Sequence, residues 1–205
     1  MKPYYDHAGI QIFHGDCREI LPTIERADAV ITDPPYGLDF KGALWDADIP
    51  SGWLELARHV APVVCFTTGP TTMWDYPRAD WVLCCHREAA NSRATSGGFS
   101  HWTPILVYGK AKWPTDVLTI HAIQQSAPKW IEHPSPKQPR LCSWLVRHAS
   151  PDQGLIVDPF TGSGSFLVAA KELGRRAVGI EIEERYCEIA AKRLSQEVFD
   201  FGEVR

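Results

Sequence analysis

The stretch that decides the fold is "LIVDPFTGSGSFLVAA", residues 155–170. An apolar run ends at Asp158, a glycine-rich turn follows, and a second apolar segment opens a helix. Gly162 and Gly164 lack Cβ atoms, so the backbone can approach a ligand closely and present amide groups from the helix start. The turn is no P-loop, because no Gly-Lys-Ser/Thr triplet follows, and this disfavours nucleotide hydrolysis. It also departs from the pattern G-x-G-x-x-G, since Leu167 stands at the third glycine.

An acidic residue follows this turn at a distance that suits a ribose. Glu181 lies at the end of the next apolar run, residues 176–182, and nineteen residues beyond Gly162. An acid placed there, at the tip of the second strand, can accept hydrogen bonds from ribose hydroxyls. The turn and the acid together favour a ribose-bearing ligand without a nucleotide phosphate chain, a description that S-adenosyl-L-methionine fits.

Working outward, the chain alternates strand-like and helix-like segments. The apolar runs with the length of strands are 10–15, 28–33, 62–68, 81–87, 104–110, 154–160 and 176–182. The helix candidates are 51–60, 138–149, 164–173 and 184–196. This alternation predicts an α/β fold, with a Rossmann-like, mostly parallel seven-stranded sheet and helices on both faces. The length of 205 residues predicts a single domain, 1–205.

Two segments have no regular pattern and are predicted to be loops. Residues 88–102 are polar and contain glycine, and residues 111–139 contain many prolines and little periodicity. Long loops in a compact domain are usually functional or disordered.

A second stretch, "ITDPPYGLDF" at residues 31–40, combines an acid, two prolines and a tyrosine at the end of an apolar run. Prolines remove backbone donors and stiffen φ, so a sheet tolerates them only at the end or edge of a strand. The prolines therefore end a buried strand and hold Asp33 and Tyr36 in a stiff turn at the sheet's carboxyl edge, where open α/β sheets bind ligands. A carboxylate and an aromatic face fixed there could hold a flat, polar group.

The composition is that of a globular protein, with 44% hydrophobic and 22% charged residues. No apolar run reaches 18 residues and the start "MKPYYDHAGI" has no signal-peptide core, so we expect a cytoplasmic protein without a membrane partner. The six cysteines show no C-x-x-C spacing and the eight histidines are scattered, so no metal site is predicted.

The net charge of −4 is unevenly distributed along the chain. Residues 86–147 hold eight Lys and Arg against three acids, which leaves a net −9 on the remainder. A basic face on an acidic body is compatible with a polyanion that docks on one side.

The motifs taken together resemble one family. The D-P-P-Y stretch, followed much later by D-P-F-T-G-S-G-S and G-I-E-I, resembles the amino-group DNA methyltransferases. The catalytic motif precedes the cofactor motif, as in the beta class of that family. The resemblance covers nearly the whole chain and implies the fold of the S-adenosylmethionine-dependent methyltransferases.

The resemblance also implies roles for particular residues. Catalysis falls to Asp33, Pro34, Pro35 and Tyr36. The segment "HGDCREILPTI" (14–24) resembles one that reaches the cofactor adenine, and "HPSPKQPRLCSWLVRHASP" (133–151) one that borders the methionine moiety. The implied cofactor residues are Asp16, Cys17, Asp158, Pro159, Phe160, Gly162, Ser163, Gly164, Glu181, Ser135 and Lys137.

The proposed chemistry explains why these residue types occur together. The lone pair of an exocyclic amine is delocalised into the ring, so the nitrogen must shift toward tetrahedral geometry. Asp33 would accept one N–H and the Pro34 carbonyl the other, which aims the lone pair at the sulfonium methyl group. Tyr36 would stack on a base flipped out of the duplex. No cysteine follows a proline, the arrangement that carbon-5 cytosine methylation uses in related enzymes.

The resemblance favours adenine N6 in double-stranded DNA as the target, because Asp33 begins the clamp where cytosine-N4 members more often place Ser. Cytosine N4, RNA or a protein glutamine, and a silent cofactor-binding subunit remain alternatives. We expect the loops 88–102 and 111–139 to face DNA, with His101 and Trp102 near the base and Lys110, Lys112 and Lys129 on phosphates. A homodimer and a cognate restriction endonuclease are further expected partners.

Overall fold

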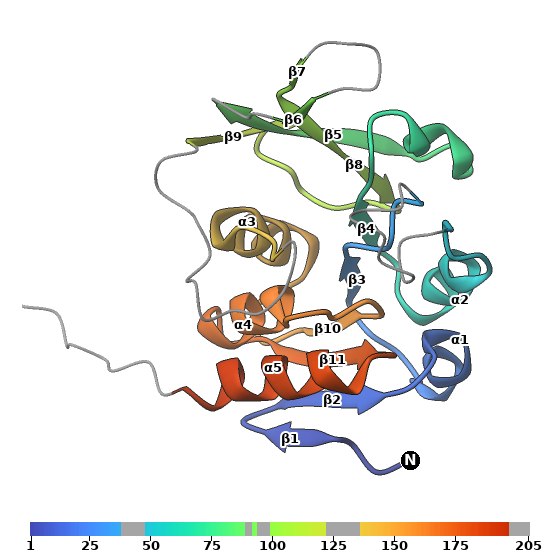
Figure 1. The fold of residues 1–205 in the computed structure, drawn as a ribbon, viewed down its shortest axis with the longest axis vertical. Coiled ribbons are helices and arrows are strands. Elements are labelled where there is room, and N and C mark those ends of the chain that lie inside the picture. Colours follow the sequence, from blue (N-terminus) through green and yellow to red (C-terminus); the bar gives the residue numbers. More distant parts are fainter. Residues whose placement is uncertain (38–47, 89–91, 94–98, 122–135, 197–205) are drawn as a thin grey trace, which may run out of the picture.

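A computed structural model describes residues 1–37, 48–88, 92–93, 99–121 and 136–196 (Figure 1). In this part of the chain, nine strands form one sheet in the order β1-β2-β11-β10-β3-β4-β8-β5-β9. Their bounds, in that order, are Tyr5–His7, Ile10–His14, Arg176–Glu181, Leu155–Asp158, Ala29–Thr32, Val64–Thr67, Trp102–Tyr108, Trp81–Glu88 and Val117–His121. A separate small pair joins β6 (Ser92–Arg93) and β7 (Phe99–Ser100).

The middle of the sheet is parallel. β2, β11, β10, β3 and β4 are neighbours that all run in one direction. Every residue of β3 and β4 is buried, which explains why these strands read as continuous apolar runs without alternation. All carboxyl ends of these five strands therefore meet at one edge of the sheet.

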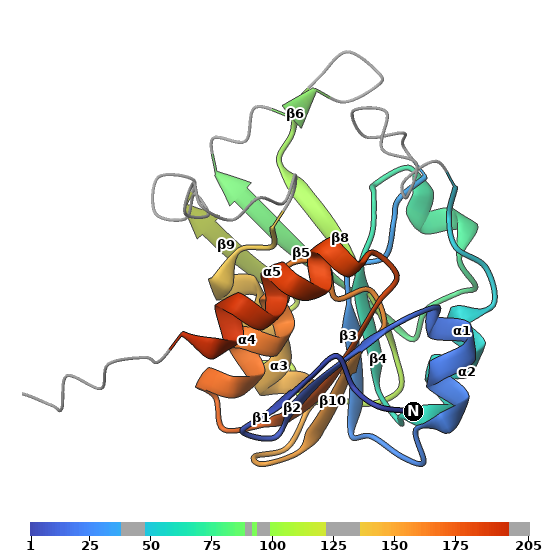
Figure 2. The ribbon, with the colours of Figure 1, turned by 60° about the horizontal axis from the view of Figure 1, so that its bottom comes forward.

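Helices cover both faces, as the sequence predicts. Figures 1 and 2 show α3, α4 and α5 on one side of the parallel strands, and α1 and α2 on the other. The bounds of the α helices are Cys17–Ile20 (α1), Trp53–Val60 (α2), Pro139–Ala149 (α3), Ser165–Glu172 (α4) and Glu184–Ser195 (α5), and short 3-10 helices span Leu21–Thr23 and Thr72–Asp75. Each longer helix turns an apolar stripe to the sheet, as α3 does with Leu141, Leu145 and Val146.

The expected number of seven strands is wrong, whereas most strands do run in one direction. All seven expected strands are present, but β1 and β9 are added at the two edges. β8 runs antiparallel to both β4 and β5, so the sheet is mixed. β1 has three residues and β9 buries only Leu118 and Ile120, which is why neither gives a long apolar run. Hydrophobic periodicity reports burial, and it carries no information about strand direction.

The two predicted loops contain regular structure. β5 extends to Glu88, β6 and β7 lie within 88–102, and β9 lies within 111–139. The remainder of these segments, 89–91, 94–98 and 122–135, lies outside the described residues. Among the residues that the structure describes, no helix has the length and hydropathy needed to cross a membrane.

Candidate active site

Four polar side chains follow or end adjacent parallel strands at the carboxyl edge of the sheet. Asp33 follows β3 directly, Thr67 ends β4, Asp158 ends β10 and Glu181 ends β11. Because these strands are neighbours in the order β11-β10-β3-β4, the four side chains lie along one edge. This is the place at which open α/β sheets bind ligands.

The carboxylate of Asp33 is held by three donors. The Tyr36 hydroxyl donates to Asp33 Oδ1 at 2.8 Å, and the Thr67 hydroxyl donates to the same oxygen. The Lys137 ammonium forms an ion pair with Oδ2. The side chains of Asp33 and Lys137 are only 22% and 19% exposed, so this network is largely shielded from water. The network fixes the carboxylate, and an incoming amine would use a remaining lone pair or replace the lysine.

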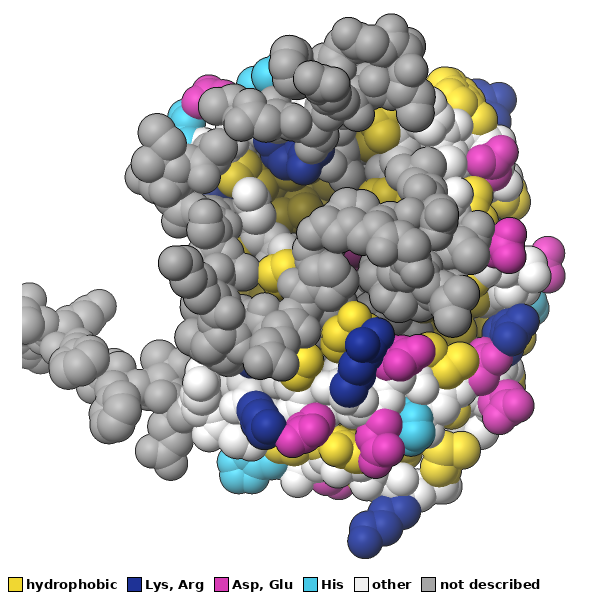
Figure 3. Space-filling view, viewed as in Figure 1, with side chains coloured by type: hydrophobic (Ala, Val, Ile, Leu, Met, Phe, Trp, Pro, Cys, Tyr) yellow, Lys and Arg dark blue, Asp and Glu magenta, His cyan; other side chains and the backbone are white. Residues whose placement is uncertain are grey.

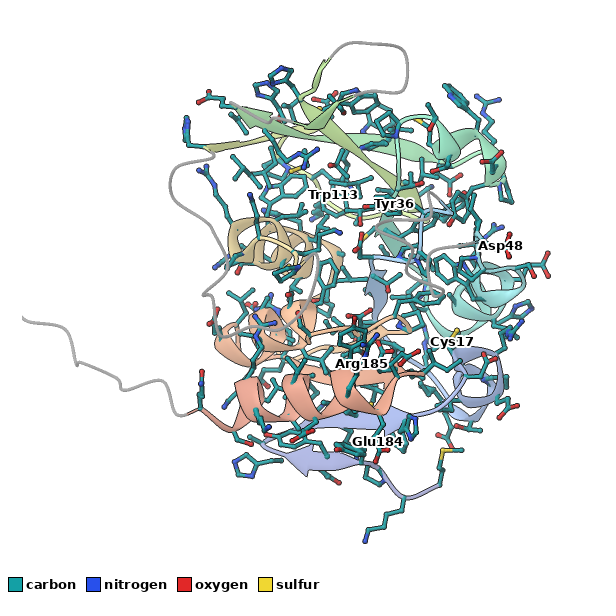
Figure 4. The ribbon with its side chains drawn as sticks, in the orientation of Figure 1. Cys17, Tyr36, Asp48, Trp113, Glu184 and Arg185 are labelled. Carbon is teal, nitrogen blue, oxygen red and sulfur yellow. The ribbon has the colours of Figure 1, made fainter. Side chains whose placement is uncertain are left out.

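Tyr36 lies beside this carboxylate in the middle of the molecule, between α3 and α2 (Figure 4). Its ring is half-buried, and the Lys137 ammonium lies 5.4 Å from the ring centroid. Burial, and then the nearby Asp33 charge, raise the pKa of Tyr36 well above its usual value. The hydroxyl therefore stays protonated and acts as a donor. Pro34 is buried and Pro35 half-buried, which fixes the turn that presents the ring.

Asp158 is buried with half of its carboxylate unused. The residue as a whole is only 1% exposed to solvent. Oδ1 accepts hydrogen bonds from the Thr32 hydroxyl at 2.6 Å and from the Phe160 amide at 3.2 Å. Oδ2 has no partner among the described residues. Burial raises the pKa of Asp158 to about 7. A buried carboxylate oxygen without a donor is a natural partner for a cationic group of a ligand.

Glu181 pins the glycine turn to the end of β11. The Gly162 amide donates to Glu181 Oε2 at 2.7 Å, and the Glu183 amide donates to Oε1 at 2.8 Å. Gly162 has φ of 50°, a left-handed conformation that favours glycine. Burial raises the pKa of Glu181. Each carboxylate oxygen keeps a lone pair, so hydrogen bonds to a ribose stay possible beside these structural ones.

Gly164 is required by packing as well as by conformation. Its φ is 78°, and an added Cβ would lie 2.9 Å from Ala190 Cβ on α5. Ser163 also faces α5, because its hydroxyl accepts a hydrogen bond from Arg193 at 3.0 Å. The structure thus places Ser163 in a contact between the glycine turn and α5, and its predicted role at the cofactor stays a prediction.

Asp16 and Cys17 lie at the start of α1, next to the end of β11. The Gly15 amide donates to the Glu181 carbonyl at 2.9 Å, which brings this segment to the same edge. Asp16 caps α1 by accepting from the Arg18 amide at 2.8 Å, and its hydrogen bond to the Arg18 guanidinium lowers its pKa. Burial raises the pKa of the Cys17 thiol to about 12, so the thiol is inert at neutral pH.

Aromatic packing fixes the residue after the D-P dipeptide of the cofactor motif. The Phe160 ring lies 5.3 Å from the Trp53 ring in an edge-to-face arrangement, and Pro159 is buried. Trp53 is itself 1% exposed and contacts Phe66 of β4 at 5.0 Å between ring centroids. Trp53 and Thr67 were not predicted to be in the site, although two hydroxyls after an apolar run, in "CFTTG", could have indicated Thr67.

Lys110 and Lys112, expected to contact phosphates, lie at the opposite edge of the sheet from Asp33. The end of β8 pairs with the start of β4, since the two strands are antiparallel. Residues that follow β8 therefore come out at the amino edge of the parallel strands, so these lysines cannot contact phosphate beside Asp33. The same reversal places the first residues of the segment 111–139 there, whereas Ser135 and Lys129 lie outside the described residues.

The face that holds the site is hollowed between α3 and the strands β5 and β8 (Figure 3). Hydrophobic side chains form the floor of the hollow, and Lys or Arg side chains lie on its wall toward β5 (Figure 3). Within the described ranges, no group of three or more His, Cys, Asp or Glu side chains is placed to hold a metal ion.

A family model described as DNA methylase, of the N6/N4 methyltransferase type, matches residues 76–192. The chain belongs to this family. It is an amino-group DNA methyltransferase, and S-adenosyl-L-methionine is the methyl donor of these enzymes.

Individual relatives cover nearly the whole chain. The Type II methyltransferase M.ScaI of Streptomyces caespitosus is 26% identical, over 96% of this chain and 84% of its own. The solved M1.HpyAVI–SAM complex is 22% identical, with a TM-score of 0.70 over 91% of this chain and 100% of that one. The PvuII cytosine-N4-specific DNA methyltransferase is 16% identical, with a TM-score of 0.74 over 96% and 90% of the two chains. At these identities the two solved structures show that the fold is shared.

Proposed function

We propose that this methyltransferase transfers the methyl group of S-adenosyl-L-methionine to N6 of an adenine flipped out of double-stranded DNA. The observation that carries the proposal is the environment of Asp33. Its carboxylate is fixed by Tyr36, Thr67 and Lys137 at the carboxyl edge of the sheet, one strand away from the turn of the cofactor motif. A positioned acceptor and an aromatic ring are what the methylation of an exocyclic amine requires.

The cofactor would lie along the edge formed by β10 and β11. Asp158 Oδ2, which is buried and has no partner in the described part of the chain, fits the ammonium group of the methionine moiety. The lone pairs left on Glu181 fit the ribose hydroxyls, and Asp16 borders the adenine side through its position at the start of α1. Bound there, the cofactor supplies a methyl group already activated by its sulfonium charge.

The chain's own residues would prepare the amine. Asp33 accepts one N–H of the target and the Pro34 carbonyl accepts the other, which localises the nitrogen lone pair. Tyr36 offers its ring as a stacking surface once the Lys137 ammonium leaves it. No covalent bond to the protein forms, in agreement with the inert Cys17 thiol. The proton of the methylated amine leaves toward the Asp33 carboxylate or water.

The choice of adenine rests on the acid at the first position of the clamp, and cytosine N4 is the second candidate because the PvuII enzyme carries that title. The test uses tritiated S-adenosyl-L-methionine and unmethylated genomic DNA. The DNA is digested to nucleosides, which are resolved by mass spectrometry, and modified-base sequencing gives the site. N6-methyladenine is expected. N4-methylcytosine would overturn the choice of base, and the absence of both methylated bases would overturn the proposed activity.

The role of Asp33 is tested with Asp33→Asn and Asp33→Ala. Both variants should bind the cofactor and lose methyl transfer by at least about a hundredfold, as the removal of one positioned electrostatic partner typically does. Asp75→Asn, a change of an exposed carboxylate in the short helix after β4, is the matched control and should keep full activity. Normal turnover by Asp33→Asn would exclude the clamp.

A further inference from the structure

Arg87 of β5 is a cation near the carboxyl edge of the sheet that the proposed reaction does not use. It belongs to β5, in which Leu83 and Cys85 are buried against the α3 side of the sheet. Side chains two apart on a strand share a face, so Arg87 projects to the same side as these two residues. Its amide donates to the His101 carbonyl at 2.6 Å, which fixes the backbone at this point.

The strand directions bring Arg87 to the edge that holds Asp33. β5 is antiparallel to β8, and β8 is antiparallel to β4, so β5 runs in the direction of β4 and ends at the same edge. The register places Leu83 level with Thr67, through Ile105 of β8 between them. Arg87 follows Leu83 by four residues, so it lies roughly 13 Å further along the strand direction and about 10 Å to the side. Its backbone therefore lies past Thr67 at the carboxyl edge, and its charge acts on Tyr36 of the clamp.

Among the residues that the structure describes, no carboxylate is paired with the guanidinium of Arg87. Its Nε is buried and has no hydrogen-bond partner within the described part of the chain. No described carboxylate forms an ion pair with it, because the neighbouring Glu88 pairs with His121 and Asp33 pairs with Lys137. The residue as a whole is half-buried, and a buried guanidinium nitrogen without a partner is costly, so such groups in proteins are usually paired or bind a ligand.

We infer that Arg87 binds a phosphodiester of the DNA strand that carries the flipped base. An anion compensates the guanidinium charge, whereas the edge of a neutral base would not, and the planar fork of Arg matches two phosphate oxygens. The inference rests on the proposed function and names a contact to the same substrate. It also replaces Lys110 and Lys112, which lie at the opposite edge of the sheet.

The test compares three variants in DNA binding. Arg87→Gln removes the charge, Arg87→Lys keeps it, and Arg176→Gln removes an exposed charge at the amino end of β11 as the matched control. Affinity for a short duplex is measured by fluorescence anisotropy over a range of salt concentrations. The duplex carries the site found by sequencing, or a random sequence if no site is found. One lost phosphate contact should make the slope of log K against log salt shallower by about 0.9.

The expected result is a shallower slope for Arg87→Gln alone, with Arg87→Lys and Arg176→Gln close to the wild type. A neutral methylphosphonate linkage next to the target base should weaken wild-type binding roughly tenfold to a hundredfold and leave Arg87→Gln unaffected. Equal slopes for all proteins, or an equal methylphosphonate penalty in wild type and Arg87→Gln, would overturn the inference. If Arg87→Gln does not fold, the test uses wild type and Arg87→Lys. Both should bind the methylphosphonate duplex more weakly than the unmodified duplex. Equal affinity for the two duplexes in both proteins would overturn the inference.

The outcome separates this contact from the proposed function. Methyl transfer by the wild-type protein with an unchanged slope in Arg87→Gln leaves the methyltransferase activity in place and removes the contact. A changed slope without any methyl transfer leaves the contact in place and removes the activity.

Discussion

The buried carboxylate of Asp158 should make this protein less stable as the pH rises. The residue is 1% exposed, one of its oxygens has no partner among the residues with described positions, and burial raises its pKa from 3.8 to about 7. The native state therefore binds this proton more tightly than the unfolded state does. Between about pH 4 and 7 the native state holds more protons, so the free energy of unfolding falls with increasing pH in that window.

The size of the effect follows from the shift. About three pKa units correspond to about 4 kcal/mol over the whole window, and the two units between about pH 5 and 7 to about 2.7 kcal/mol. Asp158→Asn keeps the shape of the side chain and removes the titration. The free energy of unfolding of the variant minus that of wild type should thus increase by about 3 kcal/mol between about pH 5 and 8.

Urea unfolding of both proteins at the two pH values measures this difference. Asp75→Asn, which removes an exposed carboxylate, should show no such change and is the control. A difference between Asp158→Asn and wild type that does not vary with pH would refute the assignment of a raised pKa to Asp158.

The same carboxylate should govern cofactor affinity. Its ionised form is the partner proposed for the cofactor ammonium, so the dissociation constant of wild type should rise by up to tenfold for each pH unit below about 7. The affinity of Asp158→Asn should be weaker above pH 7 and nearly flat below it. Calorimetric titration across this range checks both statements.

The remaining predictions concern the turn, the ring and the ribose acid. Gly164→Ala should lower the free energy of unfolding by about 2–5 kcal/mol, because φ is left-handed there and the new Cβ would contact Ala190. Gly174→Ala, which is also left-handed but has open space, should lower it by only about 1–2 kcal/mol. Equal losses in thermal unfolding would contradict this reasoning. Tyr36→Phe should keep the stacking surface and lose only the hydroxyl. Its methyl transfer should therefore be faster than that of Tyr36→Ala, which loses about 1–3 kcal/mol of stacking free energy. Glu181→Ala should weaken calorimetric cofactor binding by roughly 1–3 kcal/mol, and unchanged affinity would remove the residue from the site.

Much of the site could be predicted from local sequence. The turn after β10 and the turn after β3 follow from glycines and prolines at the end of buried runs, because backbone conformation there depends on the residues themselves. The four longer helices and the seven expected strands follow in the same way from apolar periodicity. Asp33, Asp158 and Glu181 were found because each follows or ends such a run.

Other features depended on pairing between distant segments, which no local pattern encodes. The direction of β8 decides that Lys110 lies away from Asp33, and the register of β5 decides that Arg87 lies on the same side as Thr67. The Lys137–Asp33 ion pair joins residues 104 positions apart. The sequence determined which residues form strands, turns and helices, because these choices are local. Strand order, strand direction and the partners of each charged group were decided only by the tertiary structure, because they are set by which apolar faces pack together.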